Sequence, residues 1–136
     1  MSVTTTTATV TASTKNLIIG GLTATAAAAA ATAGVAAAGE LAGISLAVGG
    51  APIPVSGFAT LTAVFSALGL VLALILARTT RRPRVAFVRT TMVLTALSLL
   101  PDVLVDASPA TKALLMLTHV VAAAIVVPVI ARRMPA

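Results

Sequence analysis

The sequence GFATLTAVFSALGLVLALILA, residues 57–77, decides the class of the fold because it contains no charged side chain. A helix of this length reaches about 30 Å, which is the thickness of the hydrocarbon core of a bilayer. The whole chain shares this character, since 59% of its 136 residues are hydrophobic and only 9% are charged. A water-soluble domain of this size needs far more polar surface. The sequence therefore predicts an integral membrane protein.

Three further apolar segments surround this one, at about residues 17–38, 85–105 and 112–131. Each is long enough to cross a bilayer as a helix. Together with residues 57–77 they predict an all-α fold, a four-helix transmembrane bundle formed by residues 15–136 as a single membrane domain. The Thr-rich residues 1–14 lack a helical period and are predicted to be a disordered tail.

The first apolar segment is dominated by Ala, Gly and Thr. Small residues spaced four apart, Ala26, Ala30 and Gly34, predict a helix face that a neighbouring backbone approaches closely. The segment is longer than the apolar core of a cleaved signal peptide, which favours a transmembrane span. Between this segment and residues 57–77, Gly49-Gly50 and two prolines predict a loop, with re-entry into the membrane interface as the alternative.

The charges predict the orientation of the bundle. The net charge is +6, and most basic residues lie near residues 78–89 or at the ends of the chain. With four spans and a cytoplasmic basic loop, both termini are cytoplasmic, and every basic residue except Lys112 lies on that side. This predicts a multi-pass protein of the cell membrane. Aromatic residues make up only 2% of the chain, so we do not expect nucleic-acid binding, and no cysteine is present for a disulfide or thiolate site.

Three segments carry a resemblance to a known family. They are APIPVSG at residues 51–57, ARTTRRPR at residues 77–84 and LLMLTHVVAAAIVVPVIARR at residues 114–133. These segments resemble a family of small four-helix membrane proteins from actinobacteria that carries a domain of unknown function. The most specific element is Leu117-Thr118-His119, followed by an apolar stretch and Pro128. The resemblance supports the four-helix layout and implies no activity.

A few ionisable residues stand out in this apolar chain. The sequence contains no phosphate-binding loop, dinucleotide fingerprint, zinc motif or nucleophile elbow, so neither a metal site nor a cofactor is predicted. His119, Asp102 and Glu40 are candidate catalytic residues. Asp106 and Lys112 are candidate ligand-binding residues. Each also has a structural interpretation, as interhelical hydrogen bonding for the histidine and as a charge marking the membrane boundary for the others.

His119 is predicted to lie about 10 Å deeper than Lys112, on the same helix face. An ionisable group at that depth needs a polar partner, so we expect His119 to approach Asp102 or Glu40. Asp102 and Asp106 are four apart and would share one face if the helix continues past Pro101. Two carboxylates held together in this way would share a proton and suit a general acid.

These observations leave three functions open. The first is a membrane protein that binds a hydrophobic small molecule or a partner protein through its helices, with a homo-oligomer or a membrane partner covering the small-residue face. The second is a membrane-embedded enzyme, an isomerase, cyclase or epoxide-opening enzyme, acting on a lipid or isoprenoid. There Asp102 or Glu40 would protonate an alkene or epoxide, and His119 would accept or relay the proton. The third is a small transporter or immunity protein.

Overall fold

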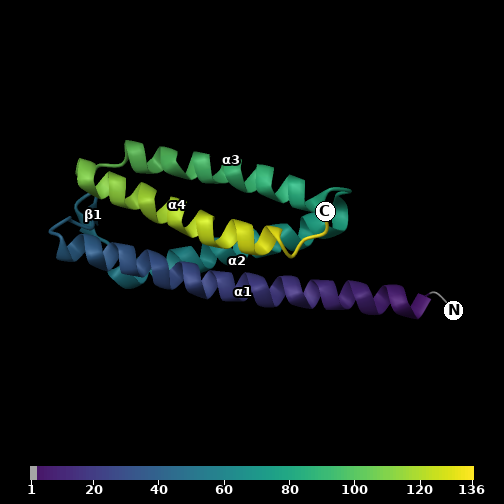
Figure 1. Ribbon diagram of the computed structural model, residues 1–136. Coiled ribbons are helices and arrows are strands. Elements are labelled where there is room, and N and C mark those ends of the chain that lie inside the picture. Colours follow the sequence, from purple (N-terminus) through teal and green to yellow (C-terminus); the bar gives the residue numbers. More distant parts are fainter. Residues whose placement is uncertain (1–2) are drawn as a thin grey trace.

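Four helices of the computed structural model follow the four apolar segments (Figure 1). They are α1 (Val3–Leu41), α2 (Val55–Thr79), α3 (Pro83–Leu104) and α4 (Pro109–Ala131). The structure describes residues 3–136, with side chains from residue 13 onward. Each helix is long and apolar enough to cross a membrane, the candidate span in α1 being Ser13–Leu41. The predicted all-α fold of four membrane helices is therefore confirmed.

The ends of α3 and α4 follow from local sequence. Each of these helices begins with a proline, which lacks an N–H and costs nothing in the first turn. The Oγ of Ser108 caps α4 by accepting a hydrogen bond from the Thr111 N–H at 3.1 Å. Two prolines, Pro101 and Pro128, lie inside helices near their C-terminal ends.

The N-terminal segment differs from its predicted state. Residues 3–14 belong to α1, where the sequence predicted a disordered tail over residues 1–14, and residues 1–2 lie outside the described part of the chain. Adding residues to an existing helix avoids the cost of nucleation, so an Ala- and Thr-rich stretch continues the helix that the apolar span starts. At 39 residues, α1 reaches beyond the other helices at its N-terminal end (Figure 1).

The loop between α1 and α2 contains a short hairpin. Strands β1 (Ala47–Val48) and β2 (Ala51–Pro52) pair antiparallel around Gly49 and Gly50, whose φ angles are +58° and +80°. Positive φ at both central residues is the geometry that favours Gly-Gly in a two-residue hairpin turn. The Gly49 N–H donates to the carbonyl of Asp106 at 2.8 Å, so the hairpin is attached to the α3–α4 loop.

The helices are not equivalent in the bundle. α1 packs along both α2 and α4, while α3 lies on the outside against α4 and α2 (Figure 1). Large apolar side chains of α2 and α3 point outward, among them Phe65, Leu68, Met92 and Leu97. This outer surface suits contact with lipid chains.

Two separate clusters of buried apolar residues hold the bundle together. We call the first the basic-end core because it lies toward the α2–α3 loop; it comprises Leu17, Ala24, Ala28, Leu70, Ala73, Phe87, Val126, Ile130, Ala131 and Met134. The hairpin-end core lies toward β1 and β2; it comprises Ala36, Leu46, Phe58, Leu114 and Leu115.

The small-residue face predicted on α1 does not pack against another helix of the same chain. Gly34 is exposed, and a Cβ added there would meet no atom of a neighbouring helix; Ala26 and Ala30 are also exposed. The packed stripe is instead Ala24, Ala28, Thr32 and Ala36. Small residues occur all around this helix, so their spacing alone could not select the face that packs.

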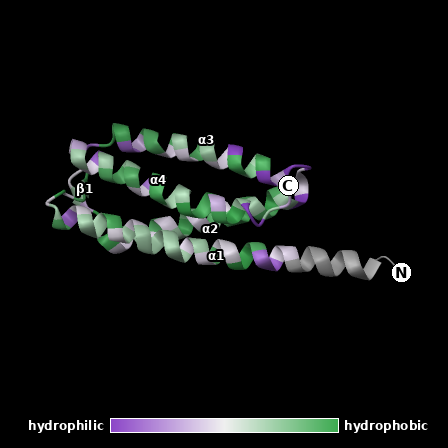
Figure 2. Cartoon of the chain, viewed as in Figure 1, coloured by the Kyte–Doolittle hydropathy of each residue, from purple (hydrophilic) through white to green (hydrophobic). Residues whose placement is uncertain are grey.

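Charge divides the two ends of the bundle. Figure 2 shows hydrophilic residues at the loop joining α2 and α3, near the C-terminus. Both termini and the α2–α3 loop lie at this basic end (Figure 1). The three acidic residues belong to the opposite half of the bundle. This division is the pattern on which the predicted orientation rests.

Candidate functional site

The candidate site is a contact between α3 and α4 in the hairpin half of the bundle. The Nδ1 of His119 lies 2.9 Å from the Oδ2 of Asp102. Asp102 is buried, with 8% of its surface exposed, in a helix that is otherwise among the most exposed of the four. The predicted approach of His119 to Asp102 is therefore confirmed.

Side-chain direction explains how these two residues meet. His119 lies ten positions into α4, whereas Asp102 lies only two positions before the end of α3. A helical side chain leans toward the N-terminal end of its own helix. Because consecutive α3 and α4 run in opposite directions, the imidazole leans toward the hairpin end and the carboxylate leans away from it. The two side chains therefore close the axial distance between their backbones.

The Nδ1 atom of His119 lies between two acceptors. It is also 2.9 Å from the carbonyl oxygen of Leu115, one turn earlier on α4. That carbonyl accepts a hydrogen bond from the Oγ1 of Thr118 at 2.7 Å. Oδ2 of Asp102, by contrast, is buried and has no well-directed hydrogen bond despite its distance from Nδ1. An unpaired buried carboxylate oxygen is costly, so we infer that the Nδ1–Oδ2 contact is the one that carries the proton.

The other face of the imidazole reaches the surface of the bundle. The His119 side chain is 39% exposed, against 11% for the side chain of Asp102. The Nε2 of His119 makes no hydrogen bond within the described residues and is not among the buried unpaired atoms. The pair therefore has a buried acid and a ring nitrogen accessible from outside the bundle.

Asp106 does not join this pair. α3 ends at Leu104, and Val105 is already extended, so the helical spacing from Asp102 is lost. The side chain of Asp106 is exposed, and the residue contributes its backbone carbonyl to the hairpin instead. The predicted pocket of two carboxylates on one helix face is wrong, because the helix stops one turn after Pro101.

Lys112 has a structural contact in this fold. Its Nζ donates to the carbonyl of Val103 at 2.9 Å. The last carbonyls of a helix lack partners within the helix, and a cation there also offsets the negative end of its dipole. Lys112 thus caps α3 and makes no ion pair with Asp102 or Asp106 in the described structure.

Glu40 lies apart from the pair. It is exposed near the end of α1, and its side chain makes no hydrogen bond or ion pair within residues 13–136. Among the candidate acids, the structure brings only Asp102 to His119. Across the same residues, no group of three His, Asp or Glu side chains could hold a metal ion.

Sequence reasoning missed a layer of buried hydroxyls between the two cores. Thr32 lies between Ala28 and Ala36 on α1, and its Oγ1 is 2.8 Å from that of Thr62 on α2. Ser66 on α2 and Thr118 on α4 likewise lie between residues of the two cores along their helices, and all three of Thr32, Ser66 and Thr118 are buried. The sequence signal that could have indicated this layer is the position of Thr32, four residues from both Ala28 and Ala36. The layer places polar groups at the depth of His119.

The fold and the site together define a class: a four-helix membrane bundle in which a buried aspartate holds a partly exposed histidine at the outer surface. The model of one protein family, described as "Family of unknown function (DUF6069)", matches residues 5–136. The chain belongs to this family. No curated protein and no solved structure matches the chain.

Proposed function

We propose that this chain is a multi-pass protein of the cell membrane that binds a hydrophobic molecule at the α3–α4 surface around His119. One observation carries the proposal: a half-exposed imidazole stands near the middle of a membrane helix, held by a buried carboxylate. Ionisable groups at this depth are costly, and they commonly serve a binding or transfer function.

The protonation of the pair indicates what the ligand must offer. A net charge in hydrocarbon is unfavourable, so we expect the pair to be neutral overall. Either a protonated His119 donates from Nδ1 to the Asp102 carboxylate, or a protonated Asp102 donates to Nδ1 of a neutral ring. In both arrangements Nε2 carries a hydrogen. The exposed nitrogen is therefore a donor that requires an acceptor.

A lipophilic molecule with a carbonyl oxygen supplies this acceptor and remains in the bilayer. Its apolar part would lie along the outward side chains of α3 and α4, such as Leu100, Val103 and Leu117, which are about half exposed. A partner protein could present the same acceptor only through a polar residue on a membrane helix. It is the alternative occupant of this surface.

The test is the set of molecules that co-purify with the protein in mild detergent. We expect the wild type to retain a carbonyl-bearing lipophile, and His119→Ala to reduce it about tenfold, the worth of one hydrogen bond in a dry site. Asp102→Asn should also reduce the amount of retained lipophile, because the His119 imidazole loses the carboxylate that holds it. Leu22→Ala, which shortens an exposed apolar side chain on α1 outside the α3–α4 surface, is the control. Equal amounts of the same lipids in all four proteins would contradict the proposal.

An acid–base enzyme is the second candidate, because a carboxylate at 2.9 Å can orient an imidazole for proton transfer. The candidate acids Glu40 and Asp106 are not at the pair, which weakens this alternative relative to binding. A membrane-embedded isomerase, cyclase or epoxide-opening enzyme would convert its lipid or isoprenoid ligand. Appearance of a product with the wild type, and of unchanged ligand with His119→Ala, would favour the enzyme.

The proposed orientation has its own test. The chain contains no cysteine, so single cysteines at Thr80 and Ser108 can be labelled without background. Thr80 lies at the basic end and Ser108 at the hairpin end. With both termini cytoplasmic, an impermeant thiol reagent labels Ser108→Cys in intact cells and Thr80→Cys only after permeabilisation. The reverse pattern would invert the orientation.

A further inference from the structure

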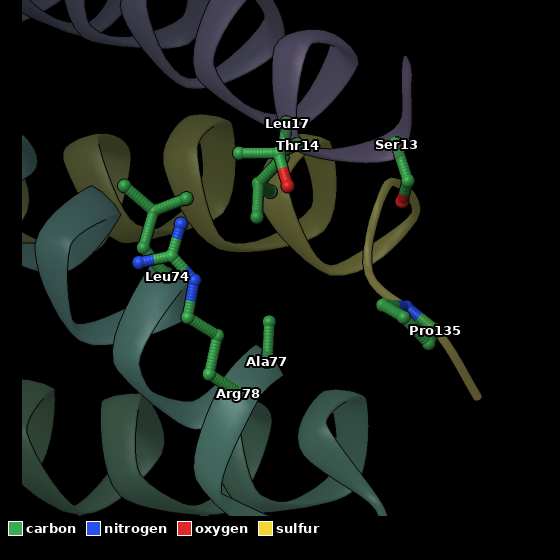
Figure 3. A pocket seen from close by; sticks show the side chains of 7 residues that line it. All are labelled: Ser13, Thr14, Leu17, Leu74, Ala77, Arg78 and Pro135. Carbon is green, nitrogen blue, oxygen red and sulfur yellow. The ribbon is translucent and has the colours of Figure 1, made fainter. Parts of the chain in front are cut away.

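A small hollow lies at the basic end, far from His119, between α1, α2 and the C-terminal segment (Figure 3). Its volume is about 200 Å³. Leu17, Leu74 and Ala77 provide apolar lining, while Ser13 and Arg78 provide polar lining. In Figure 3 the side chain of Arg78 extends from α2 alongside Leu74 toward α1. The hollow thus combines one cation with an apolar wall.

Arg78 differs from Arg84 and Arg133 of this end because its side chain has no partner within the described residues. The guanidinium of Arg84 donates to the carbonyls of Ala131 and Met134, at 2.9 and 3.1 Å. Arg133 donates to the carbonyl of Val129 at 3.0 Å. Within residues 13–136 the Arg78 side chain makes no hydrogen bond or ion pair. Its five N–H donors remain available to a ligand.

The charge around the hollow selects an anion. Lys15 and the arginines of the α2–α3 loop and the C-terminus lie at this end, and all three acidic residues lie in the other half of the bundle. No side-chain carboxylate of residues 13–136 lies at this end to compete for Arg78. Arginine matches the geometry of phosphate oxygens with paired N–H donors.

The size and position of the hollow select an amphipathic anion. Pockets that enclose a whole small molecule are about 300–1,000 Å³, so this hollow holds only part of a ligand. It lies where α1 and α2 leave the apolar span, next to leucines on both helices. A ligand that places a charged group against Arg78 while its chains stay in the bilayer meets both conditions.

We propose that this hollow binds the phosphate headgroup of an anionic phospholipid. Arg78 contacts the phosphate, and the leucine-lined wall contacts the first carbons of the acyl chains. Anionic lipids are concentrated in the leaflet that faces basic protein segments, so the ligand is abundant at this level. The site is independent of the proposed ligand site at His119.

The experiment is native mass spectrometry of the full chain in detergent with phosphatidylglycerol or phosphatidylcholine of identical acyl chains. We expect the first phosphatidylglycerol to bind about tenfold more tightly than phosphatidylcholine, since it carries the net charge that Arg78 recognises. Arg78→Gln should remove most of this preference. Arg81→Gln removes the same charge from the same end outside the hollow, and it should change binding less than about threefold.

Three outcomes would overturn the proposal. Equal losses in Arg78→Gln and Arg81→Gln would mean a diffuse basic surface rather than a site. Equal binding of the two lipids would exclude recognition of net charge. Displacement of phosphatidylglycerol by inorganic phosphate at the same concentration would mean that the hollow takes a free anion. Unchanged elution of both variants from a sizing column verifies that each is folded.

Discussion

The two ends of the bundle are held together by different interactions. At the basic end, ten buried residues form a core, and Arg84 and Arg133 bind carbonyls at the end of α4. At the hairpin end the core has only five buried residues, and hydroxyl and backbone hydrogen bonds join the loops. The smaller hairpin-end core is therefore supplemented by hydrogen bonds between its loops. The larger basic-end core holds its helices together while the α2–α3 loop stays charged and exposed.

The largest effect should come from overfilling the basic-end core. Ala28 is fully buried, so Ala28→Leu inserts a large side chain where α1 meets its neighbours. We expect the free energy of unfolding to fall by about 1–3 kcal/mol through overpacking. Ala30→Leu, on the exposed side of the same helix, should change it little. Thermal unfolding in detergent measures both, and equal losses would mean that α1 also packs through its exposed face.

A smaller effect should come from the hairpin end. The Oγ1 of buried Thr111 donates to the carbonyl of Ser45 at 2.6 Å, joining α4 to the hairpin loop. Thr111→Val keeps the shape and removes the hydroxyl, which should cost about 1–2 kcal/mol. The control is Thr60→Val, whose exposed hydroxyl bonds only to its own helix at Ser56. If the two variants unfold at the same temperature, the bond between Thr111 and Ser45 contributes nothing to the stability of this end.

The smallest effect should come from removing the hydrogen bonds of Arg84 at the basic end. Arg84→Gln removes the donors that hold the carbonyls of Ala131 and Met134. These bonds are partly exposed, so we expect a loss of about 0.5–1 kcal/mol that shrinks as salt is added. Arg81→Gln, without such bonds in the described structure, serves as the control. A loss independent of salt would show that packing of the arginine stem, not its charge, holds this end.

The fold was predictable where hydrophobicity alone decides it. Spans predicted at residues 57–77 and 112–131 lie within α2 and α4, because long uncharged segments have few alternatives in a bilayer. The packing face of α1 was not predictable. Ala28 and Ala30 are identical in chemistry, and only the side chains of the neighbouring helices decide which one is buried.

The site was predictable in part for a similar reason. The pairing of His119 with Asp102 followed from the need of each group for a polar partner at depth. The separate positions of Asp106 and Lys112 depend on where α3 ends. The sequence did not indicate where α3 ends. A proline commonly marks a helix end, but α3 continues three residues past Pro101 before it stops. The roles of these residues remain predictions.

The packing of α4 along α1 has a consequence for how the protein is made. Of the four helices described, α1 leaves the ribosome before the others, and it contacts α4, which follows the other three, along much of its length. Contacts between distant parts of a chain form late and slow the folding of the whole. Until α4 is made, α1 and α2 lie in the bilayer without one of the helices that both of them contact. A chain truncated before residue 109 would keep this pair and lack the helix that packs against α1, α2 and α3.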